Sequence, residues 1–386
     1  MSVVAAQGFR AVGVAAGIKT TGGLDLALVV NDGPSHVAAG VFTRNKVKAA
    51  PVLWSAQVLE SGELRAVVLN SGGANACTGP AGFQTTHATA EHLAGELGCG
   101  AGEVAVCSTG LIGEQLPQAK LLTGVTAAFL ELDRSQRAGD TAAAAILTTD
   151  SRAKQAVYRD PSGFTVGGFA KGAGMIAPSM ATMLAVLTTD ADVRTDVCRA
   201  ALRTAAHQTF NRLDIDGGTS TNDTLLLLAS GASGIRTDEQ ALTTAVTAVC
   251  DDLVRQLLAD AEGMTKLVTV AVRGAASEDD ALAVGHTVAR DSLVKTALFG
   301  SDPNWGRIAM AVGNAPAAVV PETLDITING VTLCQGGVAA GDRSKADLTG
   351  QEVEIVIDLG IGPGAADILT TDLSHAYVEE NSAYSS

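Results

Sequence analysis

The chain has few aromatic side chains and few basic ones. Aromatic residues make up 3% of its 386 residues, and 26 lysines and arginines face 41 aspartates and glutamates, for a formal net charge of −15. Proteins that bind nucleic acid or anionic membranes carry clustered lysine and arginine, and we find no such cluster. We therefore expect neither nucleic acid nor a membrane as a partner. An acidic small substrate is not excluded, because the local charge of a site decides what it binds.

Cysteine is also sparse and has no pattern. The six cysteines are spread along the chain without pairing or metal-ligand spacing, which is typical of proteins of the reducing cytoplasm. We expect a cytoplasmic protein without a metal site. The first residues lack a basic leader before an apolar core, and Arg10 interrupts them, so we expect no secretory signal.

No run of apolar residues qualifies as a membrane span. Between Lys171 and Asp190 lie 18 uncharged residues, which is nearly the length of a transmembrane helix. Two glycines, a proline and several hydroxyl side chains interrupt the run. A turn lined by protein or water therefore fits this segment better than lipid does.

The chain does have enough apolar sequence for sizeable cores, since 47% of it is hydrophobic, and its length suggests two or three domains. Apolar runs predict strands, and a spacing of three and four predicts helices. The expected strands are 24–30, 37–42, 66–69, 104–107, 182–187, 266–273 and 352–359, and the main helices are 80–97, 196–210 and 238–261. An Asn-Gly pair within 324–333 predicts a hairpin, and the acidic segment 274–280 is a candidate domain boundary. These elements indicate an α+β architecture with a β-rich C-terminal part.

The segment 171–182 is the most informative part of the chain. Gly172 and Gly174 permit backbone angles that are closed to other residues, and a buried strand begins at Thr182. If the bond between Ala181 and Thr182 were cut, Thr182 would carry a free α-amine beside its own hydroxyl. An α-amine, with a reference pKa near 7.7–8.0, is one base that activates such a nucleophile.

Two hydroxyl-rich turns are further candidates. Thr109 and Gly110 follow a strand and can aim a hydroxyl and an N–H at one point, as stabilisation of an oxyanion requires. An ordinary connection between a strand and a helix is the alternative. Thr148 and Thr149 lie in a turn where polar side chains would face a cleft.

Glu262 is the third candidate. It follows the predicted helix 238–261 directly, where the negative end of the helix dipole disfavours a carboxylate. Because a carboxylate is unfavourable at this end of a helix, capping alone does not explain Glu262, and a role in binding is favoured.

Segments along nearly the whole chain, in order, resemble those of the ornithine acetyltransferase family, the glutamate N-acetyltransferases called ArgJ proteins. The segment 171–182 is similar to the self-cleavage motif of that family. The other similar segments are Gly8–Ala11, Ala39–Asn45, Asn70–Gly79, Cys107–Gly113, Ser220–Thr224, Asp260–Gly263, Asp302–Arg307 and Asn381–Ser386. The match is highly specific.

The resemblance implies a fold and a division of the chain. The fold would be α+β with αββα layers, of the self-processing N-terminal-nucleophile type, with a smaller β-rich C-terminal domain. Residues 1–181 would form the α chain and the core of the nucleophile domain. Residues 182–275 would form the first part of the β chain, and 276–386 a C-terminal α+β domain with a tail that closes over the substrate.

The resemblance also implies an activity in arginine biosynthesis. The precursor would cut itself between Ala181 and Thr182. Thr182 would then take the acetyl group of N-acetylornithine and pass it to glutamate by a ping-pong route, while Thr109 and Gly110 hold the oxyanion. The implied substrate contacts are Thr148, Lys171, Thr182, Glu262, Asn381 and Ser386. No cofactor is expected, acetyl-CoA is left open as a second donor, and an α2β2 heterotetramer is expected.

Two of these contacts have specific implied roles. Lys171 would attract the α-carboxylate of the substrate, and its alternative is a plain surface charge. Glu262 would hold the δ-amine of ornithine. Of the two neighbouring threonines, Thr148 is the implied contact and Thr149 the alternative.

Departures from the family pattern are few. Gly73 and Gly218 stand where Asn and Asp are common, and the chain ends in Ser386 instead of threonine. Two other classes of protein remain open. A self-processed aminopeptidase or amidase would use water as the acceptor, and a catalytically silent binding protein would lose processing. Glu262 and the intact tail argue against both, because they suit a dibasic amino acid.

Overall fold

The computed structural model of the protein describes residues 2–177 and 183–383. Within it the chain forms two compact units. The first unit contains the residues up to Asn211 together with Thr219–Leu257, and the second contains Arg212–Gly218 together with the chain from Leu258 onward. Each unit has its own sheets and helices.

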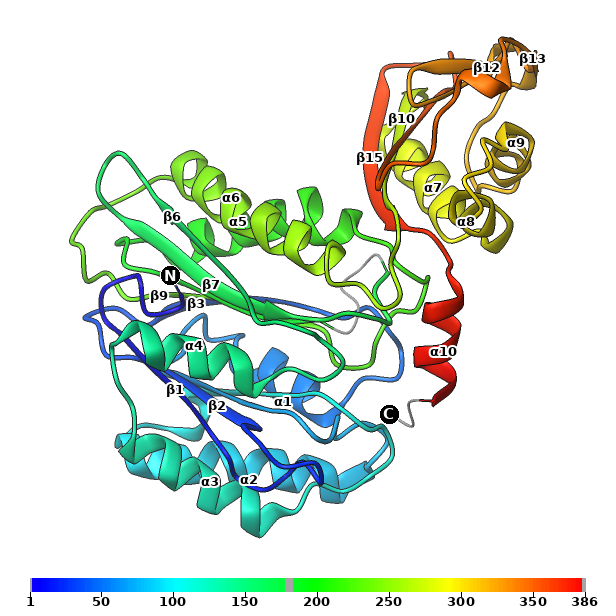
Figure 1. The fold of residues 1–386 in the computed structure, drawn as a ribbon. Coiled ribbons are helices and arrows are strands. Elements are labelled where there is room, and N and C mark those ends of the chain that lie inside the picture. The colour runs from blue at the N-terminus through cyan, green and yellow to red at the C-terminus, as the bar shows by residue number, and fades with distance from the viewer. Residues whose placement is uncertain (1, 178–182, 384–386) are drawn as a thin grey trace. The chain divides into compact units, whose positions relative to one another are not determined.

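Two sheets form the centre of the first unit (Figure 1). One has the order β1-β2-β4-β5, in which only β4 and β5 run parallel. The other has the order β3-β9-β8-β7-β6, in which only β8 and β9 run parallel. The strands are β1 (Phe9–Val14), β2 (Leu26–Asn31), β3 (Val37–Phe42), β4 (Ala66–Asn70), β5 (Val104–Ser108), β6 (Lys154–Arg159), β7 (Thr165–Lys171), β8 (Leu184–Thr189) and β9 (Thr224–Ala229).

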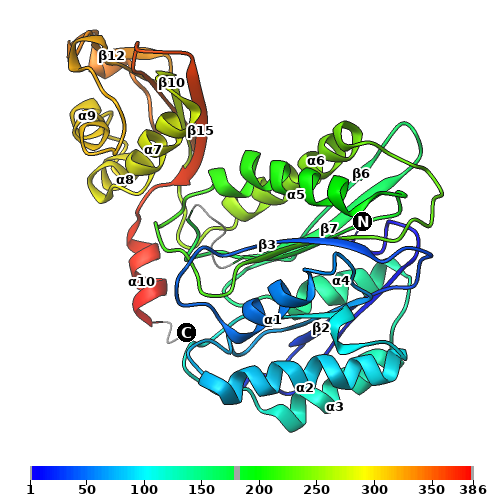
Figure 2. The same cartoon turned by 180° about the vertical axis from the view of Figure 1, so that it is seen from behind.

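Helices cover the outer faces of both sheets (Figures 1 and 2). α2 and α3 contact the four-stranded sheet, α5 and α6 lie over the five-stranded one, and α1 and α4 lie between the sheets. The helices are α1 (Ala50–Val58), α2 (Gly79–Leu97), α3 (Gln118–Leu130), α4 (Gln136–Ala145), α5 (Thr195–Gln208) and α6 (Glu239–Leu258). This arrangement confirms the layered α+β fold that we expected from the sequence.

One apolar cluster joins the two sheets. Leu28 and Leu69 from the four-stranded sheet belong to the same buried set as Val186 and Leu226 from the five-stranded one. β2, β8 and β9 are buried along their whole length. Because these strands are covered on both faces, each contains an apolar run of four or five residues instead of an alternating pattern.

The second unit is built on a sheet with the order β13-β12-β11-β14-β10-β15. α7 packs on β10 and β15, and α9 packs on β11. The elements are β10 (Leu267–Ala275), α7 (Glu278–Ala289), α8 (Ser292–Phe299), α9 (Trp305–Gly313), β11 (Asp325–Ile328), β12 (Val331–Gln335), β13 (Val338–Ala339), β14 (Glu352–Asp358), β15 (Gly364–Thr371) and α10 (His375–Ala383). Asn329 and Gly330 have φ angles of 44° and 78° between β11 and β12, which confirms the predicted hairpin turn.

The expectation for the helix before Glu262 is wrong. α6 ends at Leu258, so Glu262 lies in a turn beyond the helix and not at its terminus. Gly263 has a φ of 59°, and a Cβ at this position would lie 2.1 Å from the backbone nitrogen of Tyr377 in α10. The glycine is therefore required by close packing against α10, not by the end of α6. The dipole argument for Glu262 does not hold.

The acidic segment 274–280 contains the start of α7. Its carboxylates at 278–280 form the first turn of α7, and the Ser277 Oγ accepts a hydrogen bond from the Asp280 N–H at 3.1 Å. Acidic side chains stabilise a helix N-terminus because they face the positive end of its dipole. β10, which precedes this segment, belongs to the same unit as α7.

Within residues 2–177 and 183–383, no helix combines the length and apolar character needed to cross a membrane. In the same residues, no group of three His, Cys, Asp or Glu side chains is placed to hold a metal ion. All six cysteines carry free thiols.

Candidate active site

The turn after β5 holds Thr109 and Gly110. The Thr109 N–H donates to the Asn70 carbonyl at 3.0 Å, and the Thr109 carbonyl accepts from the Gly73 N–H at 3.0 Å. Gly110 has a φ of 126°, and a Cβ there would lie 2.5 Å from the Gly73 nitrogen. Only glycine fits this position. The turn is therefore more tightly constrained than an ordinary connection between a strand and a helix.

A second segment reaches the same turn through Asn222. Its Nδ2 donates to the Ser108 carbonyl at 2.8 Å and to the Ala74 carbonyl at 2.6 Å, and the residue is buried. Asn222 belongs to the segment that leads into β9. The last part of this segment packs against the turn that carries Thr109.

Lys171 is the last residue of β7 and points to the same place. It is 1% exposed, so the alternative of a plain surface charge is wrong. Its Nζ donates to the Thr148 Oγ1 at 2.7 Å and to the Thr109 Oγ1 at 3.2 Å. Three of the residues predicted from the sequence are thus brought together by one ammonium group. Thr148, and not Thr149, supplies the hydroxyl to it.

Asp150 and Lys154 complete this cluster, and sequence reasoning missed both. The Asp150 Oδ1 accepts from the Lys154 Nζ at 2.5 Å and from the Gly172 N–H at 2.6 Å. Its Oδ2 accepts from the Thr148 N–H at 3.2 Å and lies 4.0 Å from the Lys171 Nζ. One carboxylate therefore connects the turn that carries Thr148 with the end of β7.

The charge of Asp150 is maintained by its neighbours. Burial by itself raises the pKa of a carboxyl group. The ammonium groups of Lys171 and Lys154, with the hydrogen bonds from Lys154 and Gly172, outweigh burial and hold the pKa of Asp150 below its ordinary value. Asp150 is thus a carboxylate at neutral pH. This carboxylate therefore pairs with two lysines at once.

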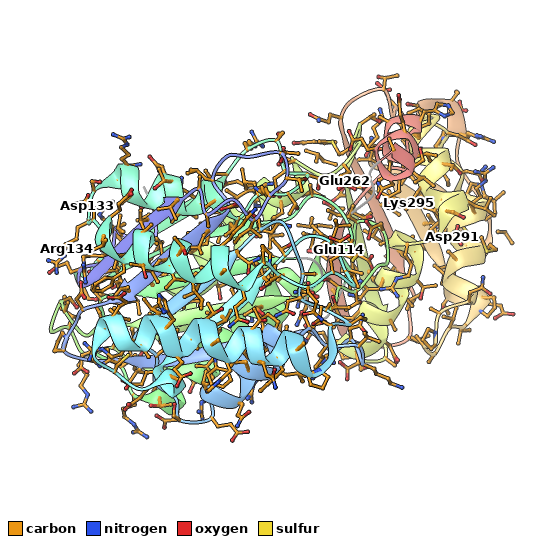
Figure 3. All side chains as sticks on the ribbon, turned by 90° about the horizontal axis from the view of Figure 1, so that it is seen from below. Glu114, Asp133, Arg134, Glu262, Asp291 and Lys295 are labelled. Carbon is orange, nitrogen blue, oxygen red and sulfur yellow. The ribbon has the colours of Figure 1, made fainter. Side chains whose placement is uncertain are left out.

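Two further predicted residues meet in the second unit. The Asn381 Nδ2, on α10, donates to the Glu262 Oε2 at 2.9 Å and to the Tyr377 carbonyl at 3.0 Å. Figure 3 labels Glu262, which lies in the turn after α6. Asn381 therefore orients one oxygen of the carboxylate and leaves its negative charge in place.

The remaining predicted site residues lie outside the described part of the chain. These are Ala181, Thr182 and Ser386. Their neighbour Met183 is described, and its N–H donates to the Asp223 Oδ1 at 3.1 Å.

The second unit also contains a small cavity of about 150 Å³, lined in part by Asp216, Lys295, Asp372 and Tyr377. Lys295, labelled in Figure 3, donates from its Nζ to the Thr370 Oγ1 at 3.1 Å. Burial lowers the pKa of Lys295 to about 8, although nearby aspartates oppose the shift. None of the predicted site residues that the structure describes lines this cavity.

Comparison with known proteins identifies the family. A model of the ArgJ family matches residues 10–386. The chain belongs to the ArgJ family. The arginine biosynthesis bifunctional protein ArgJ of Mycobacterium bovis is 61% identical over 100% of this chain and 96% of its own length. The protein of the same name from Thermobifida fusca is 57% identical over 100% of both chains.

A solved structure is also similar. The ornithine acetyltransferase of Mycobacterium tuberculosis, in complex with ornithine, is 63% identical over 46% of this chain and 94% of that one, with a TM-score of 0.45. The family match and the full-length relatives confirm the resemblance stated from the sequence. This ArgJ-family member is an acetyltransferase of arginine biosynthesis. These relatives do not favour the alternative of a self-processed aminopeptidase or amidase.

Proposed function

We propose that this ArgJ-family enzyme transfers the acetyl group of N-acetylornithine to glutamate through an acetyl-enzyme on Thr182. The observation that carries the proposal is the Lys171 ammonium group, which donates to the hydroxyls of both Thr109 and Thr148 in a buried cluster. A hydroxyl that accepts from an ammonium group keeps its own hydrogen for donation. Thr109 is therefore suited to donate to a developing oxyanion.

The oxyanion would be held by Thr109 and Gly110 together. The constrained turn fixes both groups before the reaction, so no reorganisation is needed when charge develops. Removal of one such donor typically costs about 2.7–4 kcal/mol of transition-state stabilisation. The base for Thr182 in turnover is its own α-amine, released by cleavage after Ala181.

Charge complementarity supports the substrate assignment. The Lys171 ammonium group would attract the α-carboxylate of an amino acid, with Thr148, to whose hydroxyl it donates, as a second contact. Glu262, oriented by Asn381, would pair with the δ-ammonium of ornithine. Ser386 would contribute from the C-terminal end.

Maturation and assembly follow from the same proposal. Self-cleavage gives an α chain of residues 1–181 and a β chain of residues 182–386, and two copies of each assemble as α2β2 in the cytoplasm. The division of the β chain at 275/276 stays a prediction of the sequence. No cofactor is required, and acetyl-CoA is the second candidate acetyl donor.

The acetyl-enzyme is the intermediate to test. Incubation with N-acetylornithine alone should release ornithine in a burst of one equivalent per site, and should add one acetyl group to the peptide that begins with Thr182. Glutamate added afterwards should discharge it as N-acetylglutamate. Ornithine release that occurs only when glutamate is present would contradict the ping-pong route. The same assay with acetyl-CoA decides whether it is a second donor.

A further inference from the structure

Asp223 is a buried carboxyl group to which the site described above gives no role. It precedes β9 in the segment Ser220–Thr224, which the sequence analysis singled out without a function. Its residue exposure is 0%. The Oδ1 accepts from the Met183 N–H at 3.1 Å. The Oδ2 is buried, and it has no hydrogen-bond partner among the residues that the structure describes.

Such an arrangement is costly in a purely structural residue. A buried polar atom without a partner typically costs about 1–3 kcal/mol, and more when it is charged. The Thr43 hydroxyl, which lies nearby, donates instead to the Ser220 carbonyl at 2.7 Å. This carboxyl group, which accepts from the N–H of the residue after Thr182, therefore calls for an explanation.

The surroundings of Asp223 favour the protonated form. Burial raises the pKa of Asp223 well above its ordinary value. The Met183 N–H, the hydroxyls of Thr43 and Ser220, and the ammonium group of Lys171 lower it, but they do not compensate for burial. A carboxyl group whose pKa is raised toward neutrality can both accept and return a proton.

The proposed maturation lacks one component that such a group would supply. In turnover the base for Thr182 is its own α-amine, but this amine is part of the Ala181–Thr182 peptide bond until that bond is cut. Self-cleavage must therefore use a different proton acceptor. Asp223 lies against the main chain of the residue that follows Thr182.

We propose that Asp223 carries the proton in self-cleavage, an inference that rests on the proposed processing at Ala181–Thr182. The Asp223 carboxylate takes the proton of the Thr182 hydroxyl while the oxygen attacks the Ala181 carbonyl carbon. The bond between that carbon and the Thr182 nitrogen then breaks, and Asp223 returns the proton to the leaving nitrogen. The product is an ester and a free α-amine. Water hydrolyses the ester, which leaves the Ala181 carboxylate and restores the Thr182 hydroxyl.

Asp223→Asn tests this role, with Asp190→Asn as its matched control. Asp190 lies at the other end of β8, is also buried, and accepts the N–H groups of Thr165 at 2.7 Å and Gln7 at 3.0 Å. The chains are labelled during cell-free translation, and the fraction cut is followed over time on denaturing gels. Because acid–base catalysis typically contributes 10²–10⁴-fold, Asp223→Asn should slow cleavage by about 100-fold or more. Asp190→Asn should cut at nearly the wild-type rate.

A pH profile separates proton transfer from structural support. Wild-type cleavage should accelerate with rising pH through an apparent pKa above that of an ordinary carboxyl group. Asp223→Asn should lose this titration, and Asp223→Glu should restore part of the rate and a shifted profile. Circular dichroism and urea unfolding show whether each variant is folded.

Three outcomes would overturn the inference. One is cleavage of folded Asp223→Asn at the wild-type rate. Another is an equal slowing of Asp223→Asn and Asp190→Asn, which would assign both residues a structural role. If wild type itself remains a single chain and is active, the proposed processing fails, and the role of Asp223 fails with it. The wild-type lane of the same gel distinguishes that last case from the first two.

Discussion

Asp150 and Lys154 form an ion pair in which the Lys154 Nζ lies 2.5 Å from the Asp150 Oδ1 and both side chains are 0% exposed. The pair stands beside Lys171, whose Nζ lies 4.0 Å from the other oxygen of Asp150. The carboxylate thus contacts two buried ammonium groups and offsets their mutual repulsion. Asp150 therefore helps to stabilise the buried charge of Lys171.

Breaking this pair should destabilise the protein strongly. Lys154→Met removes one partner and leaves the Asp150 charge less compensated, and such a change typically costs about 3–5 kcal/mol. The free energy of unfolding from urea titration measures it. The variant Asp150→Asn should cost at least as much, because it removes the carboxylate that pairs with both Lys154 and Lys171. A loss of less than about 1 kcal/mol for Lys154→Met, the range of exposed pairs, would contradict this account.

The same carboxylate predicts a pH dependence of stability. The pKa of Asp150 in the folded protein lies below its ordinary value, which is near 3.9 in an unfolded chain. Its ionised form therefore stabilises the fold at all pH values above about 3.9, and the contribution is lost as the pH falls through the lower folded-state pKa. The stability gap between wild type and Asp150→Asn should narrow in acid. A gap that stays constant across the urea titrations would show that ionisation of Asp150 is not responsible.

Thr109 should matter to the rate more than to binding. Thr109→Ala removes the proposed oxyanion hydroxyl and should lower kcat by roughly 10²–10³ with a smaller effect on KM, as expected for a contact made mainly in the transition state. Thr109→Ser keeps a hydroxyl and serves as the control, with most of the activity retained. If KM rises while kcat is unchanged, Thr109 binds the ground state instead.

Glu262 should select the donor. In Glu262→Gln the side-chain oxygen can still accept from the Asn381 Nδ2, so the contact seen in the structure survives while the charge is lost. Loss of one member of a desolvated charge pair costs about 2–5 kcal/mol. Transfer from N-acetylornithine should therefore fall at least thirtyfold.

Comparison of donors checks that the effect comes from the δ-ammonium. An acetylated amino acid without a δ-amine should be far less sensitive to Glu262→Gln. Glu379→Gln changes an exposed carboxylate on α10 and should leave both donors unaffected. Equal losses with the two donors, or failure of Glu262→Gln to fold, would make Glu262 structural.

Local patterns in the sequence were sufficient for elements whose cause is local. β3 has the predicted bounds Val37–Phe42, because its apolar run is bounded by turn residues. The hairpin around Asn329 and Gly330 could also be predicted, since both residues adopt the positive φ angles that its turn requires. α6 was predicted too long, because the conformation of Gly263 is set by contact with Tyr377, far away in the chain.

The site shows the same division. Lys171, Thr109 and Thr148 were identified through family segments, and the structure brings them together. Asp150 and Lys154 were missed because they join the site through contacts with the end of β7. Those contacts cannot be predicted from the spacing of residues in the sequence. The sequence did contain one signal. Lys154 is a charged residue at the start of β6, on the same side of the strand as the apolar residue Ala156.

The five-stranded sheet alternates between the two segments that self-cleavage would create. β3, β6 and β7 precede Ala181, β8 and β9 follow it, and the register pairs β3 with β9 and β7 with β8 along six residues each. After a cut behind Ala181, the hydrogen bonds between these strands would therefore still hold the two segments together. The two products would behave as a nicked protein. They would co-migrate under native conditions, denature in one cooperative transition, and, once unfolded, have to find each other by collision.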